Sequence, residues 1–401
     1  MNGPDNRALR VVMLLQNSRY PQDVRVRQEA TALTRAGHRV VVLCPRGKDQ
    51  RWREVINGVD VWRFPAPRDG VGLLGYAWEY LYSTAAAFLL SLIRAVREGV
   101  DVVHAHNPPD TLCFIGAFYK LFGKRFVFDH HDLSPEIYEV RFNGKGNVLV
   151  HKVLISLERL SCKLADRVIA TNESYKRMDV ARAAIPEDRI TIVRNGPELE
   201  LFHAGQRPVE LPGHDGKTVI CYVGAIGTQD GVEILILALH RLLKDLGRGD
   251  FVCVIVGSGD AWARAKKLST ELGLDRHVVF TGRLPYTDVP RYLAAADICV
   301  DPDPSNPLND RSTMIKMGEY MALGKPIVAF DLPEHRVTAG DAACYAKPND
   351  DMAFAELLQA LMDDPERRRQ MGAAGRRRIE DELAWSHQER HLLAVYRALA
   401  R

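Results

Sequence analysis

Two charged side chains in the C-terminal half are spaced so that they could bind a nucleotide. Lys316 and Glu319 lie in the segment 310–328, which has the pattern of a capped helix followed at once by a strand. A helix N-terminus presents free N–H groups that bind anions, and residues at i and i+3 share one helix face. Helix amides and Lys316 would contact the phosphates of a nucleoside diphosphate, and Glu319 would accept hydrogen bonds from ribose hydroxyls. This segment alone leaves open an ordinary surface pair of a lysine and a glutamate.

The ends of the same segment carry residues that favour helix boundaries. Ser312 or Thr313 can cap the helix start, because a side-chain oxygen there accepts a hydrogen bond from a free backbone N–H. Gly324, followed by Pro326, can end it, since glycine tolerates the left-handed conformation that often follows a last turn. We therefore expect a short helix whose amino end is open to a ligand.

Histidines gather where two strands of the N-terminal half are expected to end. His104 and His106 end one strand, and His130, His131 and Asp132 follow another. Histidine is a frequent metal ligand, but the carboxyl ends of parallel strands are also where organic ligands usually bind. We expect these residues to line a ligand site and not to hold a metal. A buried core histidine stays open for at least one of them.

Asp301 and Asp303 form a second pattern with metal-binding chemistry. Two carboxylates around one proline could bridge a divalent cation to a diphosphate, because such cations prefer oxygen ligands. The pair directly follows an expected strand of a parallel sheet, and the phosphate site proposed above uses amides and cations instead of carboxylates. We therefore expect no metal there.

Short apolar runs alternate with helical patterns along nearly the whole chain, as in a parallel sheet covered by helices on both faces. A polar stretch at 196–217 interrupts the alternation. The expected fold class is α/β, with two doubly wound Rossmann-like domains facing a central cleft. We expect an N-terminal domain at 1–195, a C-terminal domain at 196–384 and a helix at 385–401 that packs back on the first domain. The runs expected as strands are 10–15, 39–43, 59–64, 101–105, 125–129, 167–170, 190–193, 219–223, 251–256, 278–280, 298–300, 327–330 and 343–345.

Composition and charge exclude several classes of protein. The chain has 54 Lys and Arg against 51 Asp and Glu, and a net charge of +3 does not indicate a nucleic-acid partner. Its seven cysteines are scattered without short paired spacings, which indicates reduced thiols. Residues 1–9 lack the apolar core of a secretory signal. We expect a cytoplasmic protein.

One long apolar stretch, 71–96, leaves two interpretations open. Glu79 and Arg94 interrupt it, so it barely reaches the ~20 apolar residues that a membrane-spanning helix needs. The first interpretation is a helix packed in the α/β layers. The second is an interfacial helix, which would bring the protein into peripheral contact with the inner face of a membrane.

A nicotinamide-dependent dehydrogenase does not fit the loops between strands and helices. Its pyrophosphate requires glycines between the first strand and the first helix, and residues 16–21 contain none. Gly257 and Gly259 follow a later strand, but Trp262 stands where the third small residue belongs. A tight turn explains both glycines.

Several motifs together resemble glycosyltransferase family 4, the retaining nucleotide-sugar transferases of the GT-B superfold, over nearly the whole chain. The most specific is Glu-Tyr-Met-Ala-Leu-Gly-Lys-Pro-Ile-Val at 319–328, which is similar to the family's glutamate, Met-Ala, Gly, Pro, Val signature. Phe-Asp-His-His-Asp at 128–132 lies where the family carries a histidine beside the sugar. Further similarity lies in the helix and turn at 24–38, the Asn-Gly turn at 195–196 and Phe-Thr-Gly-Arg at 280–283.

The resemblance implies a sugar transfer from a nucleoside-diphosphate donor to an acceptor hydroxyl with retained configuration, without metal or cofactor, in polysaccharide or glycoconjugate biosynthesis. It implies front-face attack, in which the leaving-group oxygen receives the acceptor proton. His131 would orient the donor sugar or the reacting hydroxyl, and Lys316 would stabilise the departing diphosphate. The acceptor would be a glycan, a lipid-linked intermediate or a small molecule, held by the N-terminal domain. The expected donor-binding residues are Gly224, Arg283, Thr313, Met314, Lys316 and Glu319, and the expected acceptor or cleft residues are Arg25, His104, His106 and Asp132.

The chain departs from the family pattern at the donor site. Many members carry a second glutamate eight positions before the first, where this chain has Arg311, with Asn309 or Asp310 as substitutes. Ala225 and Asp230 stand where members commonly carry Arg and Lys. We therefore expect the donor phosphates to be neutralised by Lys316, Arg25 or Arg283.

Two other functions remain as alternatives. A nucleotide-sugar epimerase of the same superfold would share both sheets and the diphosphate site, and would act without an acceptor. A non-catalytic two-lobed ligand-binding protein would bind the nucleotide without turnover. The absence of a signal peptide and the arrangement of Lys316 and Glu319 favour an enzyme.

Overall fold

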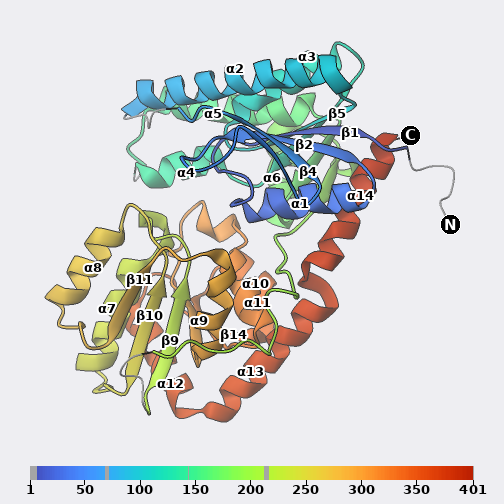
Figure 1. Ribbon diagram of the computed structural model, residues 1–401. Helices are drawn as coiled ribbons and strands as arrows, with labels where there is room; N and C mark the ends of the chain where they lie inside the picture. The colour runs from blue at the N-terminus through green and yellow to red at the C-terminus, as the bar shows by residue number, and fades with distance from the viewer. Residues whose placement is uncertain (1–6, 68–71, 143, 212–215, 401) are drawn as a thin grey trace. The chain divides into compact units, whose positions relative to one another are not determined.

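The computed structural model describes residues 7–67, 72–142, 144–211 and 216–400. The chain divides into two compact units (Figure 1). Unit 1 comprises Met1–Arg194 and Gln388–Arg401, and unit 2 comprises Asn195–His387. The expected polar N-terminus as far as Asn6 and the expected start of the apolar stretch at Val71 lie outside the described residues, as do residues 212–215 of the expected connection.

Unit 1 contains an eight-stranded sheet in the order β3-β4-β2-β1-β5-β6-β7-β8. All neighbours except β3 and β4 are parallel. Its inner strands are buried along nearly their whole length, as expected for a sheet covered on both faces. The strands are β1 (Arg10–Leu14), β2 (Arg39–Pro45), β3 (Arg53–Ile56), β4 (Val59–Phe64), β5 (Val102–His106), β6 (Arg125–His130), β7 (Arg167–Ala170) and β8 (Ile190–Ile192).

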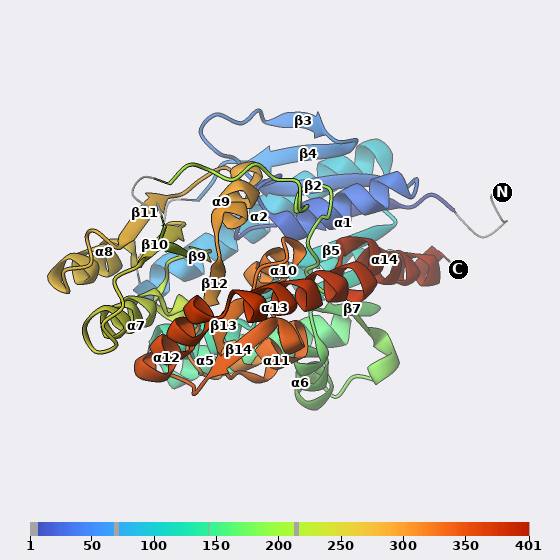
Figure 2. The ribbon, with the colours of Figure 1, turned by 90° about the horizontal axis from the view of Figure 1, so that it is seen from below.

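Strand β3 was not expected from the sequence, and it pairs antiparallel with β4 at the sheet edge (Figure 2). Its residues alternate between exposed and partly buried, so they form no apolar run. The turn between the strands is Asn57-Gly58, and both residues have positive φ, 51° and 82°. Asn-Gly between two strands is a strong hairpin signal, and this dipeptide could have indicated β3 from the sequence.

Helices cover both faces of this sheet. Helices α2 (Gly72–Glu98) and α3 (Cys113–Lys120) lie on one face, and α1 (Val24–Arg35) and α14 (Trp385–Ala400) lie on the other (Figures 1 and 2). Helix α14 is fixed to unit 1 by hydrogen bonds between Tyr396 Oη and His104 Nδ1 (2.8 Å) and between His391 Nδ1 and the Ile192 carbonyl (3.2 Å). The remaining helices of unit 1 are α4 (Ser134–Arg141), α5 (Val148–Leu164) and α6 (Glu173–Ala183).

Unit 2 contains a six-stranded, fully parallel sheet in the order β11-β10-β9-β12-β13-β14. Apolar clusters lie on both of its faces. The strands are β9 (Thr218–Val223), β10 (Phe251–Val256), β11 (Val278–Gly282), β12 (Ile298–Asp301), β13 (Ile327–Phe330) and β14 (Ala343–Ala346). The helices are α7 (Val232–Lys244), α8 (Trp262–Glu271), α9 (Val289–Ala295), α10 (Ile315–Ala322), α11 (Pro333–Ala339), α12 (Asp351–Asp363) and α13 (Pro365–Arg378).

Helix α10 is the short helix expected before β13, but its start differs from the prediction. The N-cap is Met314, which makes no side-chain cap bond, so capping by Ser312 or Thr313 was wrong. Both residues belong instead to the segment that leads into the helix. Gly324 does end the helix as expected, with φ of 65°.

Glycines allow three loops of unit 2 to approach one another closely. A Cβ atom at Gly257 would lie 1.8 Å from the carbonyl oxygen of Gly224, and one at Gly259 would lie 2.3 Å from that of Ile226. A Cβ at Gly231 would lie 1.9 Å from the carbonyl oxygen of Pro302. The loops after β9, β10 and β12 therefore pack backbone against backbone at the carboxyl edge of the sheet.

This close packing predicts that Gly231→Ala is much more destabilising than Gly273→Ala. Both glycines have positive φ, 65° and 71°, so the conformational strain is shared. Only Gly231 would also gain a clash, because nothing lies within 4 Å of a Cβ at Gly273. We expect losses of about 1 kcal/mol for Gly273→Ala and about 2 to 4 kcal/mol for Gly231→Ala, measured by denaturant unfolding. Equal losses would show that the loops yield easily.

Candidate active site

In unit 2 the candidate site is centred on Lys316, at the second position of α10. Its Nζ lies 3.0 Å from Asp301 Oδ1 and 2.6 Å from Asp303 Oδ1. It also lies 5.0 Å from the centre of the Tyr222 ring. The lysine side chain is only 10% exposed and both aspartates are buried. The ammonium group therefore occupies the space between the two carboxylates that a cation could bridge.

The charges of this cluster depend on one another. Burial by itself lowers the pKa of Lys316, but Asp301 and Asp303 raise it well above its ordinary value. Burial by itself raises the pKa of Asp301, yet the Lys316 charge lowers it overall. Burial and the nearby Asp301 charge raise the pKa of Asp303. Lys316 is thus a firmly protonated cation whose counter-charges are supplied from within the protein.

Glu319, one turn further along α10, is buried and accepts a hydrogen bond from Tyr286 Oη at 2.7 Å. Burial raises the pKa of Glu319 to about 7, although the bond from Tyr286 opposes the shift. Tyr286 lies in the loop after β11, three residues from Arg283, whose side chain is exposed. The loop of Arg283 is therefore joined to α10 through the Tyr286–Glu319 bond.

Gly224 follows β9 and lies beside the same cluster. A Cβ there would be 3.0 Å from Tyr222 Oη, the phenol that lies below Lys316. Asp230 accepts a hydrogen bond from the backbone N–H of Gly227 at 2.7 Å, which orders the loop. The ends of β9 and β12, the start of α10 and the loop after β11 thus contribute groups to one edge of unit 2.

In unit 1 a buried arginine organises the carboxyl edge of the sheet. Arg25 of α1 donates two hydrogen bonds to the carboxylate of Asp129, at 2.8 and 2.7 Å, and one to the Val193 carbonyl at 2.9 Å. It also lies 3.2 Å from Glu29. Arg25 was expected at an acceptor site or on the donor phosphates, but it is buried in these contacts. That expectation was wrong, because the guanidinium neutralises internal carboxylates.

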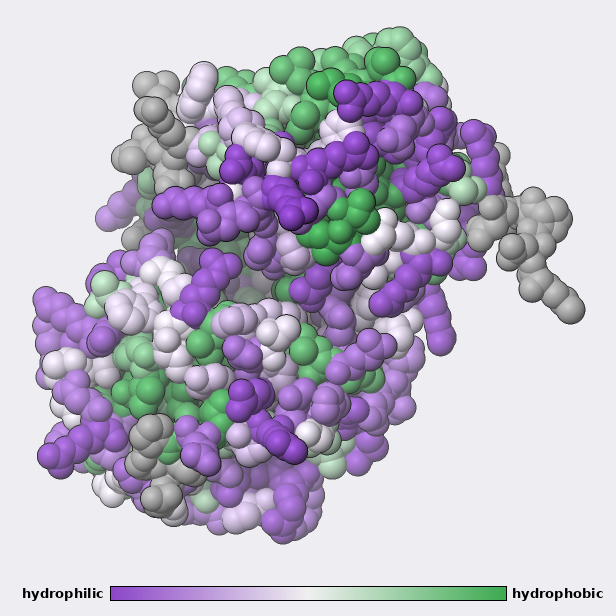
Figure 3. All heavy atoms as spheres, in the orientation of Figure 1, coloured by the Kyte–Doolittle hydropathy of each residue, from purple (hydrophilic) through white to green (hydrophobic). Residues whose placement is uncertain are grey.

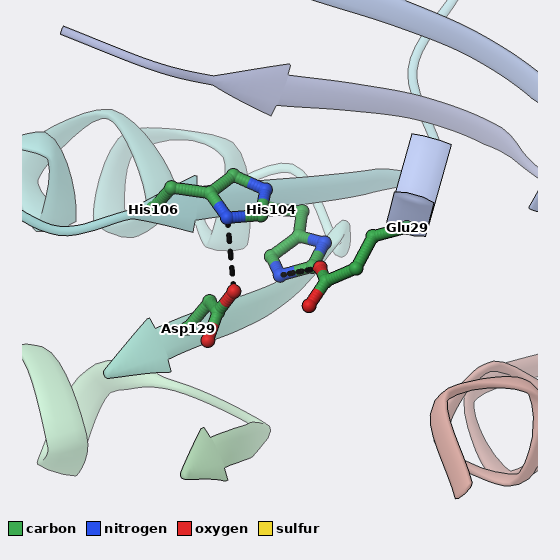
Figure 4. A group of neighbouring side chains, drawn as sticks. All are labelled: Glu29, His104, His106 and Asp129. Carbon is green, nitrogen blue, oxygen red and sulfur yellow. Dashed lines mark ion pairs between the residues drawn. The ribbon is translucent and has the colours of Figure 1, made fainter. Parts of the chain in front are cut away.

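His104 and His106 lie beside the carboxylates of Glu29 and Asp129 (Figure 4). His106 Nδ1 lies 2.9 Å from Asp129, and His104 Nε2 lies 3.8 Å from Glu29. Burial lowers the pKa of both histidines. Both side chains are fully buried, so they do not line an open site as expected. The core-histidine alternative describes them.

A metal site could be built from four of these side chains, since one potential ligand atom of each lies within 4.8 Å of the others. They are Glu29, His104, His106 and Asp129. Arg25, however, forms a two-pronged salt bridge with Asp129 and approaches Glu29. A guanidinium in that position supplies the positive charge that a metal would bring. Glu29, beside Asp129, has a pKa raised well above its ordinary value by burial and by the Asp129 charge. The cluster is therefore an internal charge network in which Arg25 is the neutralising cation.

His131 is the partly exposed member of the histidine group. Its backbone N–H and that of Asp132 both donate to Asn107 Oδ1, at 2.9 and 3.1 Å. Its Nδ1 lies 3.6 Å from Asp129. Burial by itself lowers the pKa of His131, but the contact with Asp129 raises it overall. The loop after β6 is thus fixed by Asn107, and the imidazole is cationic over a wider pH range than usual.

His130, the preceding residue, points into a different buried network. Its Nδ1 lies 2.7 Å from Asp179 and its Nε2 lies 3.6 Å from Glu158. Arg182 lies 3.1 Å from Glu158 and forms a second ion pair with Glu136. Burial by itself lowers the pKa of His130, but Asp179 and the neighbouring carboxylates raise it to about 10. His130 is a structural cation of unit 1.

Comparison with known proteins identifies the family. Residues 22–196 match the family model described as glycosyl transferase 4-like domain, and residues 208–378 match that described as glycosyl transferases group 1. The alpha-maltose-1-phosphate synthase of Mycolicibacterium smegmatis is 30% identical over 372 residues, which span 85% of this chain and 91% of that protein. The chain belongs to glycosyltransferase family 4.

Other relatives of this glycosyltransferase agree with the assignment. The 2-deoxystreptamine glucosyltransferase of Streptomyces kanamyceticus is 26% identical over 400 residues, 96% of this chain and 97% of that one. The sucrose-phosphate synthase structure from Thermosynechococcus elongatus has a TM-score of 0.76 at 20% identity and covers 98% of this chain and 99% of that one. The structure of Anabaena HepE in complex with UDP-glucose has a TM-score of 0.71 at 16% identity. The match covers 97% of this chain and 100% of that one. The GT-B fold is confirmed, and neither the epimerase nor the binding protein is favoured.

Some of the expected site residues of this glycosyltransferase lie together at one edge of unit 2, and others do not. The structure brings Gly224 and Lys316 together around Tyr222, and places Arg283 in the loop whose Tyr286 binds Glu319. Met314 occupies the N-cap position of α10 and packs on an apolar cluster, while Thr313, Arg311 and Asp132 are partly buried. The sequence interpretation missed Tyr222, Tyr286 and Asp179 because each acts through a partner distant in the chain. Only position gave a clue, since Tyr222 lies two residues before the expected Gly224.

The His130 network predicts how stability depends on pH. The pKa of His130 is about 10 in the folded protein and about 6.5 when unfolded. The stabilisation from its bound proton is therefore complete below about pH 6.5 and is lost as the pH rises towards 10, by up to about 1.4 kcal/mol per pH unit. Calorimetry from about pH 7 to about pH 10 should show that the free energy of unfolding falls less steeply with pH in His130→Gln than in the wild type. His240→Gln, the same change at a partly buried histidine of α7, should retain the wild-type slope, and a wild-type slope in His130→Gln would contradict the assignment.

Proposed function

We propose that this glycosyltransferase moves a sugar from a nucleoside diphosphate to an acceptor hydroxyl with retention of configuration. The bond between the anomeric carbon and the diphosphate oxygen breaks, and a bond from that carbon to the acceptor oxygen forms. The acceptor proton passes to the leaving diphosphate. Retention is what membership of family 4 implies, and the alternative functions have no observation in their favour.

The observation that carries this proposal is that Lys316 and Glu319 lie one turn apart on α10. A departing diphosphate develops negative charge, and a preorganised cation stabilises that charge without reorganisation. Lys316 is held as a cation beside the helix N-terminus, close to Gly224, where backbone can approach a phosphate. Glu319 lies one turn deeper, where a ribose would follow the diphosphate. Unit 2 is therefore the proposed donor-binding unit, with Arg283 as an exposed second cation.

Unit 1 is the proposed acceptor-binding unit. His131 is partly exposed at the carboxyl end of β6, and its contact with Asp129 raises the pKa of its imidazole above the ordinary value. A cationic imidazole donates hydrogen bonds from both nitrogens, so His131 can orient a hydroxyl of the donor sugar or of the acceptor. Asp132, held by Asn107 through its backbone, is the neighbouring carboxylate for the acceptor.

We propose that the reaction needs neither a metal nor a cofactor. Lys316 Nζ already lies between Asp301 and Asp303. This ammonium occupies the space between the two carboxylates that a divalent cation would otherwise bridge.

The donor base and the acceptor are open to direct screening. A ligand that binds only the folded state raises the melting temperature, so UDP, GDP, ADP and dTDP sugars can be compared in one experiment. UDP sugars are the first choice, because the HepE structure contains UDP-glucose. Small hydroxylated acceptors are the first choice, because one relative is named for transfer to 2-deoxystreptamine.

The pKa of Glu319 predicts a pH-dependent donor affinity. Its carboxyl group is half ionised at about pH 7, so the carboxylate that accepts from a ribose becomes more populated as the pH rises. Affinity for the nucleotide sugar should increase from about pH 6 to about pH 8, and Glu319→Gln should remove this dependence and weaken binding about ten-fold at the higher pH. Calorimetric titration with the intact nucleotide sugar measures both. Glu271→Gln, on the exposed face of α8, is the matched control, and an unchanged pH slope in Glu319→Gln would reject the ribose contact.

Replacement of His131 should separate catalysis from donor binding. We expect His131→Ala to lower kcat about a hundred-fold or more while donor affinity changes little, because the imidazole acts near the reacting carbon. Melting temperature, donor affinity and single-turnover rate are measured on one preparation. His151→Ala, at a partly buried histidine of α5, controls for loss of an imidazole. A folded His131→Ala enzyme with wild-type turnover would eliminate the role.

A further inference from the structure

Helix α2 carries its apolar side chains on the outside of unit 1. Leu81, Leu89 and Val96 are 65%, 61% and 88% exposed, and Trp78 and Ile93 are also exposed. These positions recur every three or four residues, so they form one stripe along a single helix face. Ala85, also exposed, fills the gap in the stripe between Leu81 and Leu89. The outward face of α2 is therefore apolar over most of its length.

The inward face of α2 includes three polar residues. Ser83, Ser91 and Arg94 are buried against unit 1. Ser91 Oγ accepts a hydrogen bond from Tyr119 Oη at 3.1 Å, and Arg94 forms an ion pair with Glu98 at 2.9 Å. A helix that only covered a sheet would place serines outward and leucines inward. This reversed polarity is the pattern of a helix whose outer face is also covered.

Helix α3 extends the same apolar surface. Phe114 is exposed on α3, and Leu121 and Phe122 are exposed immediately after it. The ring of Phe118 packs edge-on against Phe88 of α2 and also contacts Phe122, with centroids 4.9 and 5.1 Å apart. Figure 3 shows apolar side chains gathered at the top of unit 1, over α3 and the adjoining part of α2. We call the exposed residues together the α2–α3 face: Trp78, Leu81, Leu89, Ile93, Val96, Phe114, Leu121 and Phe122.

The basic residues of this part of unit 1 indicate what covers the face. In the described residues of 72–164, the exposed acidic side chain is Glu98, whose carboxylate is paired with Arg94. On α5, Val148, Leu149 and Val153 are exposed alongside basic residues, so apolar and cationic groups are mixed there. The exposed basic residues of the same range are Arg97, Arg125, Arg141, Lys145, Lys152, Arg159 and Lys163.

We propose that unit 1 binds the surface of an anionic lipid bilayer through the α2–α3 face, with the basic residues of α5 and its flanks on the lipid headgroups. An apolar helix face with lysines and arginines beside it is the signature of a helix that lies in the bilayer interface. Among the helices of the described ranges, none is long and apolar enough to cross a bilayer. The helix therefore lies in the interface plane.

A second copy of this chain fits the same face less well. A symmetric dimer brings the same patch of both subunits together, so the basic residues of α5, which packs against α3, would approach those of the other subunit. Anionic headgroups neutralise these charges instead, and each basic residue near such a surface strengthens binding about five-fold. Charge therefore favours an anionic bilayer over a second copy of the chain. The membrane proposal does not depend on the proposed sugar transfer, because membrane binding is measured without substrate.

The test is co-sedimentation of the full chain with lipid vesicles. One set of vesicles is phosphatidylcholine alone, and the other is an equal mixture of phosphatidylcholine and phosphatidylglycerol. The first variant is Leu89→Glu with Val96→Glu. Its matched control is Leu237→Glu with Val337→Glu, which makes the same charge change at helix positions of unit 2 that are 38% and 49% exposed. The second variant is Lys152→Ala with Arg159→Ala, and melting temperature is recorded for every protein.

We expect the wild type and the unit 2 control to bind the anionic vesicles and to bind phosphatidylcholine far more weakly. Leu89→Glu with Val96→Glu should lose at least ten-fold in binding, and Lys152→Ala with Arg159→Ala should lose roughly 25-fold. A wild-type chain that ignores anionic vesicles, or a folded Leu89→Glu, Val96→Glu variant that binds them normally, overturns the proposal. A wild-type dimer in sedimentation velocity that this variant dissociates also overturns it, because the face is then an interface between chains.

Discussion

The salt bridge between Arg25 and Asp129 is the interaction on which the arrangement of unit 1 depends. Both groups are fully buried, and an isolated buried charge costs several kcal/mol. Arg25 therefore ties α1 to the end of β6 through Asp129 and to the end of β8 through the Val193 carbonyl. His106 at the end of β5 joins through the same carboxylate. One guanidinium thus fixes the edge from which His131 projects.

Unit 2 solves the same physical problem with a different cation. Asp301 and Asp303 would repel each other in the interior, and Lys316 Nζ lies within 3.0 Å of both. The ammonium of Lys316 is therefore engaged inside the protein, and its side chain is only 10% exposed. A phosphate that approaches Lys316 must share this cation with two carboxylates. The strength of donor binding is then set by the balance between internal and external partners, and not by the lysine charge alone.

The sequence predicted the fold well because its signals are local. Apolar runs such as 251–256 and 327–330 become strands without reference to distant residues, and they lie where expected. The edge strand β3 was missed since one face of it is open to solvent and its pattern is mixed. The site was predicted less completely. Residue types and spacing located Lys316, Glu319 and His131, but burial and pairing depend on contacts such as Arg25 with Asp129, which are 104 positions apart. No local pattern reveals whether a histidine is at a surface or inside a charge network.

Helix α14 shows how the order of the sequence constrains the making of the protein. Unit 1 includes residues from both sides of unit 2 in the sequence, because α14 from Gln388 onward belongs to unit 1. Until Tyr396 emerges from the ribosome, the buried imidazole of His104 on β5 lacks its hydroxyl partner. Unit 2 is continuous in sequence and can complete its fold earlier. The unit with the lower residue numbers is therefore the last to be finished during synthesis.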